Sequence, residues 1–192
     1  MRLMAFLEYA AVVLGVIGVV ASQFAGVPKG SFHFGVGLIG FGIVLGGLEA
    51  VLTRRMCFRV SDDSYDDYAG APALIVGLMA LFIGAAVIGA AYLHAEGRWH
   101  TTIDALLRRP GPVLIAAGFL FVGAGMLFLF NPGGRQGLVW MLLVRVPKVL
   151  LGLVLIVAGF GGIALGAWEF VQPLAFDRFV RTMPPPLLWL AR

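Results

Sequence analysis

The chain has 192 residues, of which 60% are hydrophobic and 12% charged, and its formal net charge is +4. Soluble domains carry about 25% charged residues, so a chain this apolar cannot cover its surface in water. The single cysteine excludes an intrachain disulfide and a thiolate metal cluster. No run of basic residues exceeds two, so we expect no nucleic acid among the partners.

Five long apolar stretches follow one another along the chain, and each approaches or exceeds the length that crosses a bilayer. About 20 helical residues span the roughly 30 Å hydrocarbon core. The predicted fold class is therefore all-α, a polytopic transmembrane helical bundle of about five spans with short interfacial helices. We expect a single transmembrane domain over residues 1–173, because no other part is long enough for a second core. The predicted spans cover residues 3–22, 32–52, 72–94, 113–130 and 149–171.

The joints between the spans are short, and two of them contain residues that predict where a helix begins or lies. Pro72 suits the first turn of the third helix, where its missing N–H costs nothing. The fourth joint holds the apolar run 138–144 around Trp140, flanked by Arg135 and Arg145. This run is too short to span and predicts a helix lying in the headgroup plane.

The C-terminal segment 174–192 is predicted to be an interfacial or partner-docking tail. Its first half places Phe176 and Phe179 at roughly helical spacing among charged residues. Tryptophan favours the membrane–water boundary, so we expect all four to be interfacial anchors. These anchors are Trp99, Trp140, Trp168 and Trp189.

Lysine and arginine divide equally between the two predicted sides of the membrane, so the positive-inside rule gives no net preference. The first helix usually dominates, and Arg2 precedes it whereas Lys29 follows it. We therefore expect the N-terminus inside. The arrangement Tyr68-Ala69-Gly70-Ala71-Pro72 is generic among small bacterial membrane proteins, and the bacterial cytoplasmic membrane is the expected location.

Many of the 27 glycines fall at small-xxx-small spacing within the spans. Helices in lipid associate through close van der Waals packing, and glycine lets two backbones approach. We predict helix packing at these positions, and one glycine face could also dock a different protein. The pairs are Gly42 with Gly46, Ala85 with Gly89, and Gly162 with Gly166.

Three acidic residues, Glu8, Glu49 and Glu169, lie inside apolar stretches. Ionisable groups in a membrane are costly and point to function by default. All three lie near helix ends, however, where they could reach headgroups or an arginine. A structural ion cluster with Arg54 and Arg55 is the simpler interpretation for Glu8 and Glu49, and a proton or cation path is the alternative.

The three histidines all fall on the second predicted side. His33 begins the second span, His94 ends the third, and His100 follows in the third joint. Histidine with nearby carboxylates can bind zinc or copper, so these three are metal-ligand candidates. Their spacing matches no compact ligand motif, and interfacial histidines are ordinary.

A weak internal similarity links residues 40–49 with residues 159–169, both of which begin Gly-Phe-Gly and end in glutamate. Duplicated halves are common in transporters. Because glycine, alanine, leucine and phenylalanine dominate the chain, chance similarity is the simpler explanation.

No nucleophile, nucleotide or cofactor motif is present in the sequence. The preferred hypothesis is a non-catalytic accessory subunit with a scaffold, packing or assembly role in a larger membrane complex, for example a bioenergetic one. Its partners would be other integral membrane subunits and lipids, with bound lipids expected and no cofactor predicted. The alternatives are a small transporter or channel acting as an oligomer, and a metal-dependent membrane enzyme.

Overall fold

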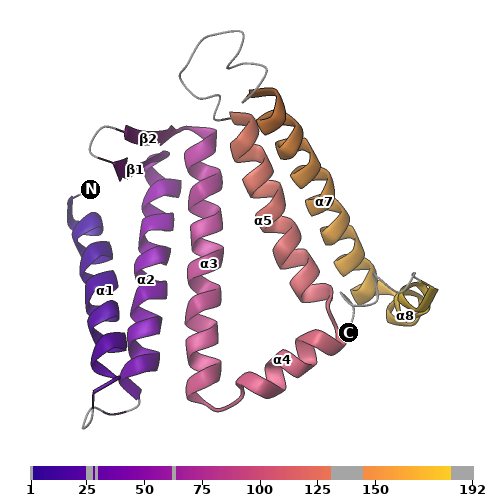
Figure 1. Ribbon diagram of the computed structural model, residues 1–192, viewed down its shortest axis with the longest axis horizontal. Coiled ribbons are helices and arrows are strands. Elements are labelled where there is room, and N and C mark those ends of the chain that lie inside the picture. Colours follow the sequence, from indigo (N-terminus) through magenta and orange to yellow (C-terminus); the bar gives the residue numbers. More distant parts are fainter. Residues whose placement is uncertain (1, 25–27, 29, 62–63, 131–144, 183–192) are drawn as a thin grey trace. The chain divides into compact units, whose positions relative to one another are not determined.

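The computed structural model describes residues 2–24, 28, 30–61, 64–130 and 145–182, and for residues 2–3, 56–61 and 64–68 it describes the backbone alone. Five helices are long and apolar enough to cross a membrane, which confirms the predicted all-α transmembrane fold. Their ends lie within three residues of the predicted ones, because the length of an apolar run directly limits a spanning helix. They are α1 (Arg2–Ala21), α2 (Gly30–Thr53), α3 (Ala71–Ala95), α5 (Gly111–Phe130) and α7 (Val146–Val171) (Figure 1).

The chain divides into two compact units, Met1–Trp99 and His100–Arg192. In the first unit α2 contacts both α1 and α3, and in the second α5 packs along α7. The single transmembrane domain expected over residues 1–173 stays a prediction, since each unit is described by itself.

Glycines spaced seven residues apart form the interface between α5 and α7. Gly118 and Gly159 face each other so closely that a Cβ on either would lie within 2.6 Å of the other's carbonyl oxygen. A seven-residue repeat keeps one stripe of a helix turned toward its partner. We call this interface the α5–α7 seam. Its glycine pairs are Gly111–Gly166, Gly118–Gly159 and Gly125–Gly152.

Helix α2 carries two such stripes, one for each neighbour. Gly40 and Gly47 lie against Gly84 and Gly77 of α3, which we call the α2–α3 seam. Gly35 lies against Gly15 of α1. The glycines are buried, and in the described part of the chain no large side chain is fully buried. Backbone contact rather than interlocking large side chains therefore forms the core, as expected where lipid supplies no hydrophobic drive between helices.

A β-hairpin, which the sequence did not predict, joins α2 to α3. Strand β1 (Arg55–Ser61) pairs antiparallel with β2 (Ser64–Ala69), with Arg55 opposite Ala69. Arg54 adopts a left-handed φ of 53° as α2 ends, and its carbonyl accepts the Gly70 N–H at 2.8 Å. Pro72 lies in the first turn of α3, as predicted.

Two short amphipathic helices complete the described fold. Helix α4 (Trp99–Arg108), which the sequence did not predict, has Trp99, Ile103 and Leu106 on one face and Asp104 opposite. It has no buried residue. Helix α8 (Pro173–Thr182) forms the first half of the predicted interfacial tail. The predicted interfacial run 138–144 and the end of the tail, 183–192, lie outside the described residues.

Candidate functional site

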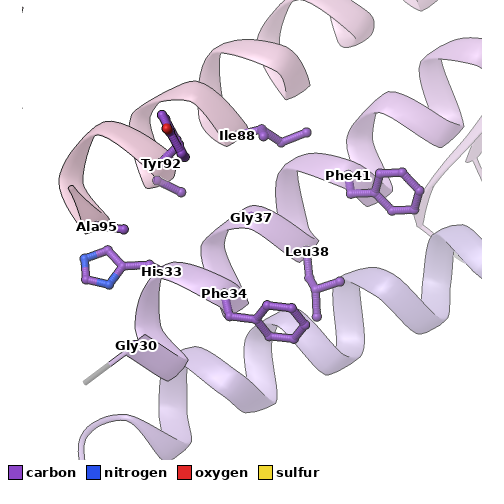
Figure 2. Close-up of a pocket in the computed structure, with 10 residues that line it drawn as sticks. Gly30, His33, Phe34, Gly37, Leu38, Phe41, Ile88, Tyr92 and Ala95 are labelled. Carbon is purple, nitrogen blue, oxygen red and sulfur yellow. The ribbon is translucent and has the colours of Figure 1, made fainter. Parts of the chain in front are cut away.

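A groove of about 500 Å³ lies between α2 and α3, at the end where α2 begins. Phe34, Leu38 and Phe41 line it from α2 (Figure 2). Ile88 and Tyr92 line it from α3. Its volume falls within the roughly 300–1,000 Å³ typical of small-molecule sites, which are likewise mostly apolar.

The position of the groove follows from the glycine series of the seam. Seven residues before Gly40, α2 carries His33, and seven residues after Gly84, α3 carries Ala91. At the Gly40–Gly84 level a Cβ on Gly84 would lie 2.7 Å from the Gly40 carbonyl oxygen, so an imidazole could not be accommodated at that separation. The seam therefore cannot continue past His33, and the helices leave a groove there.

Figure 2 shows His33 at one end of the groove, beside Ala95. Its Nε2 nitrogen is buried and has no hydrogen-bond partner among the described residues. An unpaired buried polar atom costs about 1–3 kcal/mol, and most such atoms in proteins have a partner. The groove thus has apolar walls and ends at a histidine whose buried Nε2 is unpaired.

The histidines predicted as metal ligands are partly brought together. The rings of His33 and His94 lie 4.9 Å apart between centroids, and the His94 ring stacks on Trp99 at 6.3 Å. His100 belongs to the second unit. Among the described residues, no three side chains of histidine, cysteine, aspartate or glutamate converge as a metal site would require.

Glu169 is buried, with 8% of its surface exposed, and its carboxylate accepts the backbone N–H of Gly111. Gly111 begins α5, where the first N–H groups have no partner within the helix. A carboxylate there satisfies one donor and complements the positive end of the helix dipole. Arg109 lines a small cavity of about 100 Å³ with Glu169. The acid therefore has a structural partner at the end of the α5–α7 seam.

Glu8 has a similar position at the α1–α2 interface. A Cβ on Gly46 would lie 2.6 Å from its carboxylate oxygen, so the glycine leaves the space that the acid fills. Glu49 is half-buried and close enough to interact electrostatically with Glu8. Within the described part of the chain, no ion pair joins either acid to Arg54 or Arg55. The ion cluster considered from the sequence is thus absent there, and both acids lie close to a helix interface.

The predicted helix-packing pairs have different surroundings. Gly42 and Gly46 contact α1, and Gly162 and Gly166 lie against α5. Ala85 is exposed, and nothing lies within 4 Å of where a Cβ on Gly89 would stand. A spacing of four residues does not say which face of a helix meets a partner. The seven-residue spacing matched on the neighbouring helix does, and it is readable in the sequence.

Two of the predicted tryptophan anchors lie in the described residues. The Trp99 ring stacks on His94, and the Trp168 ring lies 6.0 Å from Phe176 and 5.2 Å from Phe179. Trp168 thereby holds α8 against the end of α7. Trp140 and Trp189 lie outside the described residues.

No protein-family model, curated protein or solved structure matches the chain.

Proposed function

We propose that the chain is a non-catalytic accessory subunit that packs against other integral membrane subunits. The observation that carries this proposal is a pair of glycines, Gly89 and Gly161, that face away from the interfaces within their own units. Nothing lies within 4 Å of a Cβ built on either. On α7, Gly161 is two residues from the seam glycine Gly159, which turns it about 200° from α5.

Glycine on an outward face allows a second helix to approach closely. Every described glycine pair within the seams brings two backbones together, and the same chemistry operates between chains. Large apolar side chains flank Gly161: Val157 is 71% exposed and Phe160 is 56% exposed. A partner helix could rest on the glycine while these side chains pack around it.

The polar groups within the described spans also support a packing role. Glu169 caps α5, and Glu8 fills the space above Gly46. A carboxylate that already serves a helix terminus or a helix interface is poorly suited to passing ions along a path. This supports the subunit over the transporter and over the metal-dependent enzyme.

The test is purification from native membranes in a gentle detergent, followed by native electrophoresis and mass spectrometry. We expect other integral membrane polypeptides in fixed stoichiometry with the wild-type chain. Gly161→Ala should weaken this association and Gly161→Leu should abolish it, because each step adds bulk at the contact while the seam is untouched. Recovery of the lone chain or its homo-oligomer from the wild type and from both Gly161 variants would refute the proposal.

The proposed location is the bacterial cytoplasmic membrane, with the N-terminus inside. Asp104 is exposed on α4, which follows three spans and would then lie outside. A Cys57→Ser, Asp104→Cys variant should react with a membrane-impermeant maleimide in intact cells. Labelling that requires permeabilised cells would reverse the orientation.

A further inference from the structure

We propose that the groove between α2 and α3 is a binding site for one phospholipid of the adjoining leaflet, with an acyl chain along the groove and an ester or phosphate oxygen at His33. The proposal goes beyond the subunit role, and it rests on the depth of the groove along α2, its apolar lining and the histidine at its surface end.

The groove has the depth of a single lipid leaflet. On α2 it extends from Gly30, the first residue of the helix, to Phe41. Eleven residues of α-helix rise about 16 Å, which is about half of the roughly 30 Å hydrocarbon core. The groove therefore runs from the membrane surface to the midplane. At the deep end of the groove the glycine pair Gly40–Gly84 closes the two helices together, and Gly47–Gly77 does so beyond it.

The lining of the groove changes from polar at the membrane surface to apolar at depth, as a phospholipid does from its headgroup to its acyl chains. His33 lies at the surface end, where the ester and phosphate groups of a lipid are found, and an imidazole N–H can donate a hydrogen bond to such an oxygen. Below it the walls are Leu38, Phe41 and Ile88, which offer only apolar surface. Gly37 leaves open space between them, with nothing within 4 Å of a Cβ position.

The charges near this end of α3 do not oppose a lipid headgroup. Glu96 and Arg98 form an ion pair at 3.8 Å just past the end of the helix. Two aromatic rings lie beside the His33 ring, with Phe32 at 5.6 Å and His94 at 4.9 Å between ring centroids.

A partner helix fits the groove less well than a lipid. A spanning helix extends through the whole bilayer, whereas this groove ends near the midplane. A lipid provides both the half-length apolar chain and the free oxygen acceptor.

The test is native mass spectrometry of the delipidated chain, titrated with a phosphatidylglycerol that carries one C16 and one C18 acyl chain. We expect the wild type to bind one phospholipid in preference to further copies. Gly37→Leu fills the groove without meeting a neighbour, and its bound fraction should fall about tenfold or more. Gly89→Leu is the matched control, because it also fills open space on a helix but does not line the groove, and it should bind as the wild type does.

A second pair of variants tests the hydrogen bond at His33. His33→Ala should weaken binding about fivefold, the order expected for loss of one hydrogen bond. His33→Gln retains an N–H donor and should restore part of the binding. Equal binding by His33→Ala and the wild type would refute this contact.

Equal phospholipid binding by the wild type, Gly37→Leu and Gly89→Leu would overturn the proposed site. So would cross-linking of a Leu38→Cys variant to another polypeptide in native membranes, because a protein would then occupy the groove. The titration uses the isolated chain, so its failure would leave the subunit proposal standing, and failure of the co-purification would leave the lipid site standing.

Discussion

In the α5–α7 pair, glycine faces glycine at three successive levels, from Gly125–Gly152 at one end to Gly111–Gly166 at the other. The α2–α3 pair has the same arrangement at two levels, and His33 and Ala91 occupy the next. The first pair ends in a carboxylate that caps a helix, and the second ends in a groove with an unpaired nitrogen. The same seven-residue glycine spacing thus forms a closed helix interface in one unit, and in the other it ends at a groove large enough for a small molecule.

The difference shows that one substitution in a glycine series can turn a closed helix interface into a candidate binding site. A single ring in place of hydrogen at one level of the repeat is enough to end close contact, because the Gly–Gly levels leave no room for even a Cβ. The glutamates also depend on glycines of the neighbouring helix. Glu169 and Glu8 lie where a glycine of the neighbouring helix leaves space for a carboxylate.

The largest expected effect comes from placing bulk inside the closed part of the α2–α3 pair. A Cβ on Gly47 would lie 2.8 Å from the Gly77 carbonyl oxygen, so Gly47→Leu must separate the two backbones. We expect loss of the folded form in detergent, seen by size-exclusion chromatography and circular dichroism. Gly37→Leu, on the same helix but in the groove, should remain folded. Two equally folded variants would show that the seam is not closely packed.

The capping role of Glu169 gives the next largest effect. Glu169→Ala leaves the Gly111 N–H without its acceptor, and the free energy of unfolding should fall by about 1–2 kcal/mol. Glu169→Gln retains an oxygen acceptor and should lose less. Unfolding in a graded mixture of mild and denaturing detergent measures both. Equal stability of Glu169→Ala and the wild type would rule out the cap.

Replacing His33 by glycine, where the α2–α3 glycine series stops, should have the smallest effect on stability. His33→Gly extends the α2–α3 series by one level, and the packing gained is offset by the roughly 0.5–1 kcal/mol cost of glycine in a helix. The ends of the helices should move closer. Spin labels at Phe32→Cys and Glu96→Cys, in a Cys57→Ser background, would report a shorter distance by pulsed electron paramagnetic resonance. An unchanged distance would mean that His33 does not hold the groove open.

Much of the fold was predictable, because apolar length fixes a span in lipid. Each of the five spanning helices follows the predicted range closely, and Pro72 correctly marked the start of α3. Helix α4 and the hairpin from Arg55 to Ala69 were not predicted. Both are short elements in polar joints, where no long apolar run signals structure.

The groove could not be predicted, because it depends on which helix lies opposite which. The signal that was present in the sequence was the seven-residue spacing. Gly40 and Gly47 have this spacing on α2, Gly159 and Gly166 have it on α7, and both pairs lie in seams. Among the candidates spaced by four, Gly42 and Gly46 meet a helix, whereas Gly89 does not. Only the register between helices separates these cases.

The central claim is that glycines in the seams are required for close backbone contact while outward glycines are not. Thermal unfolding of four Gly→Ala variants in one detergent tests it most directly. Gly84→Ala and Gly118→Ala should lower Tm, because the added methyl group would lie within 2.7 Å of a backbone oxygen, and overpacking costs about 1–3 kcal/mol. Gly89→Ala and Gly161→Ala should leave Tm unchanged or raise it, since alanine favours helix over glycine. The same change in Tm for all four variants would contradict the account.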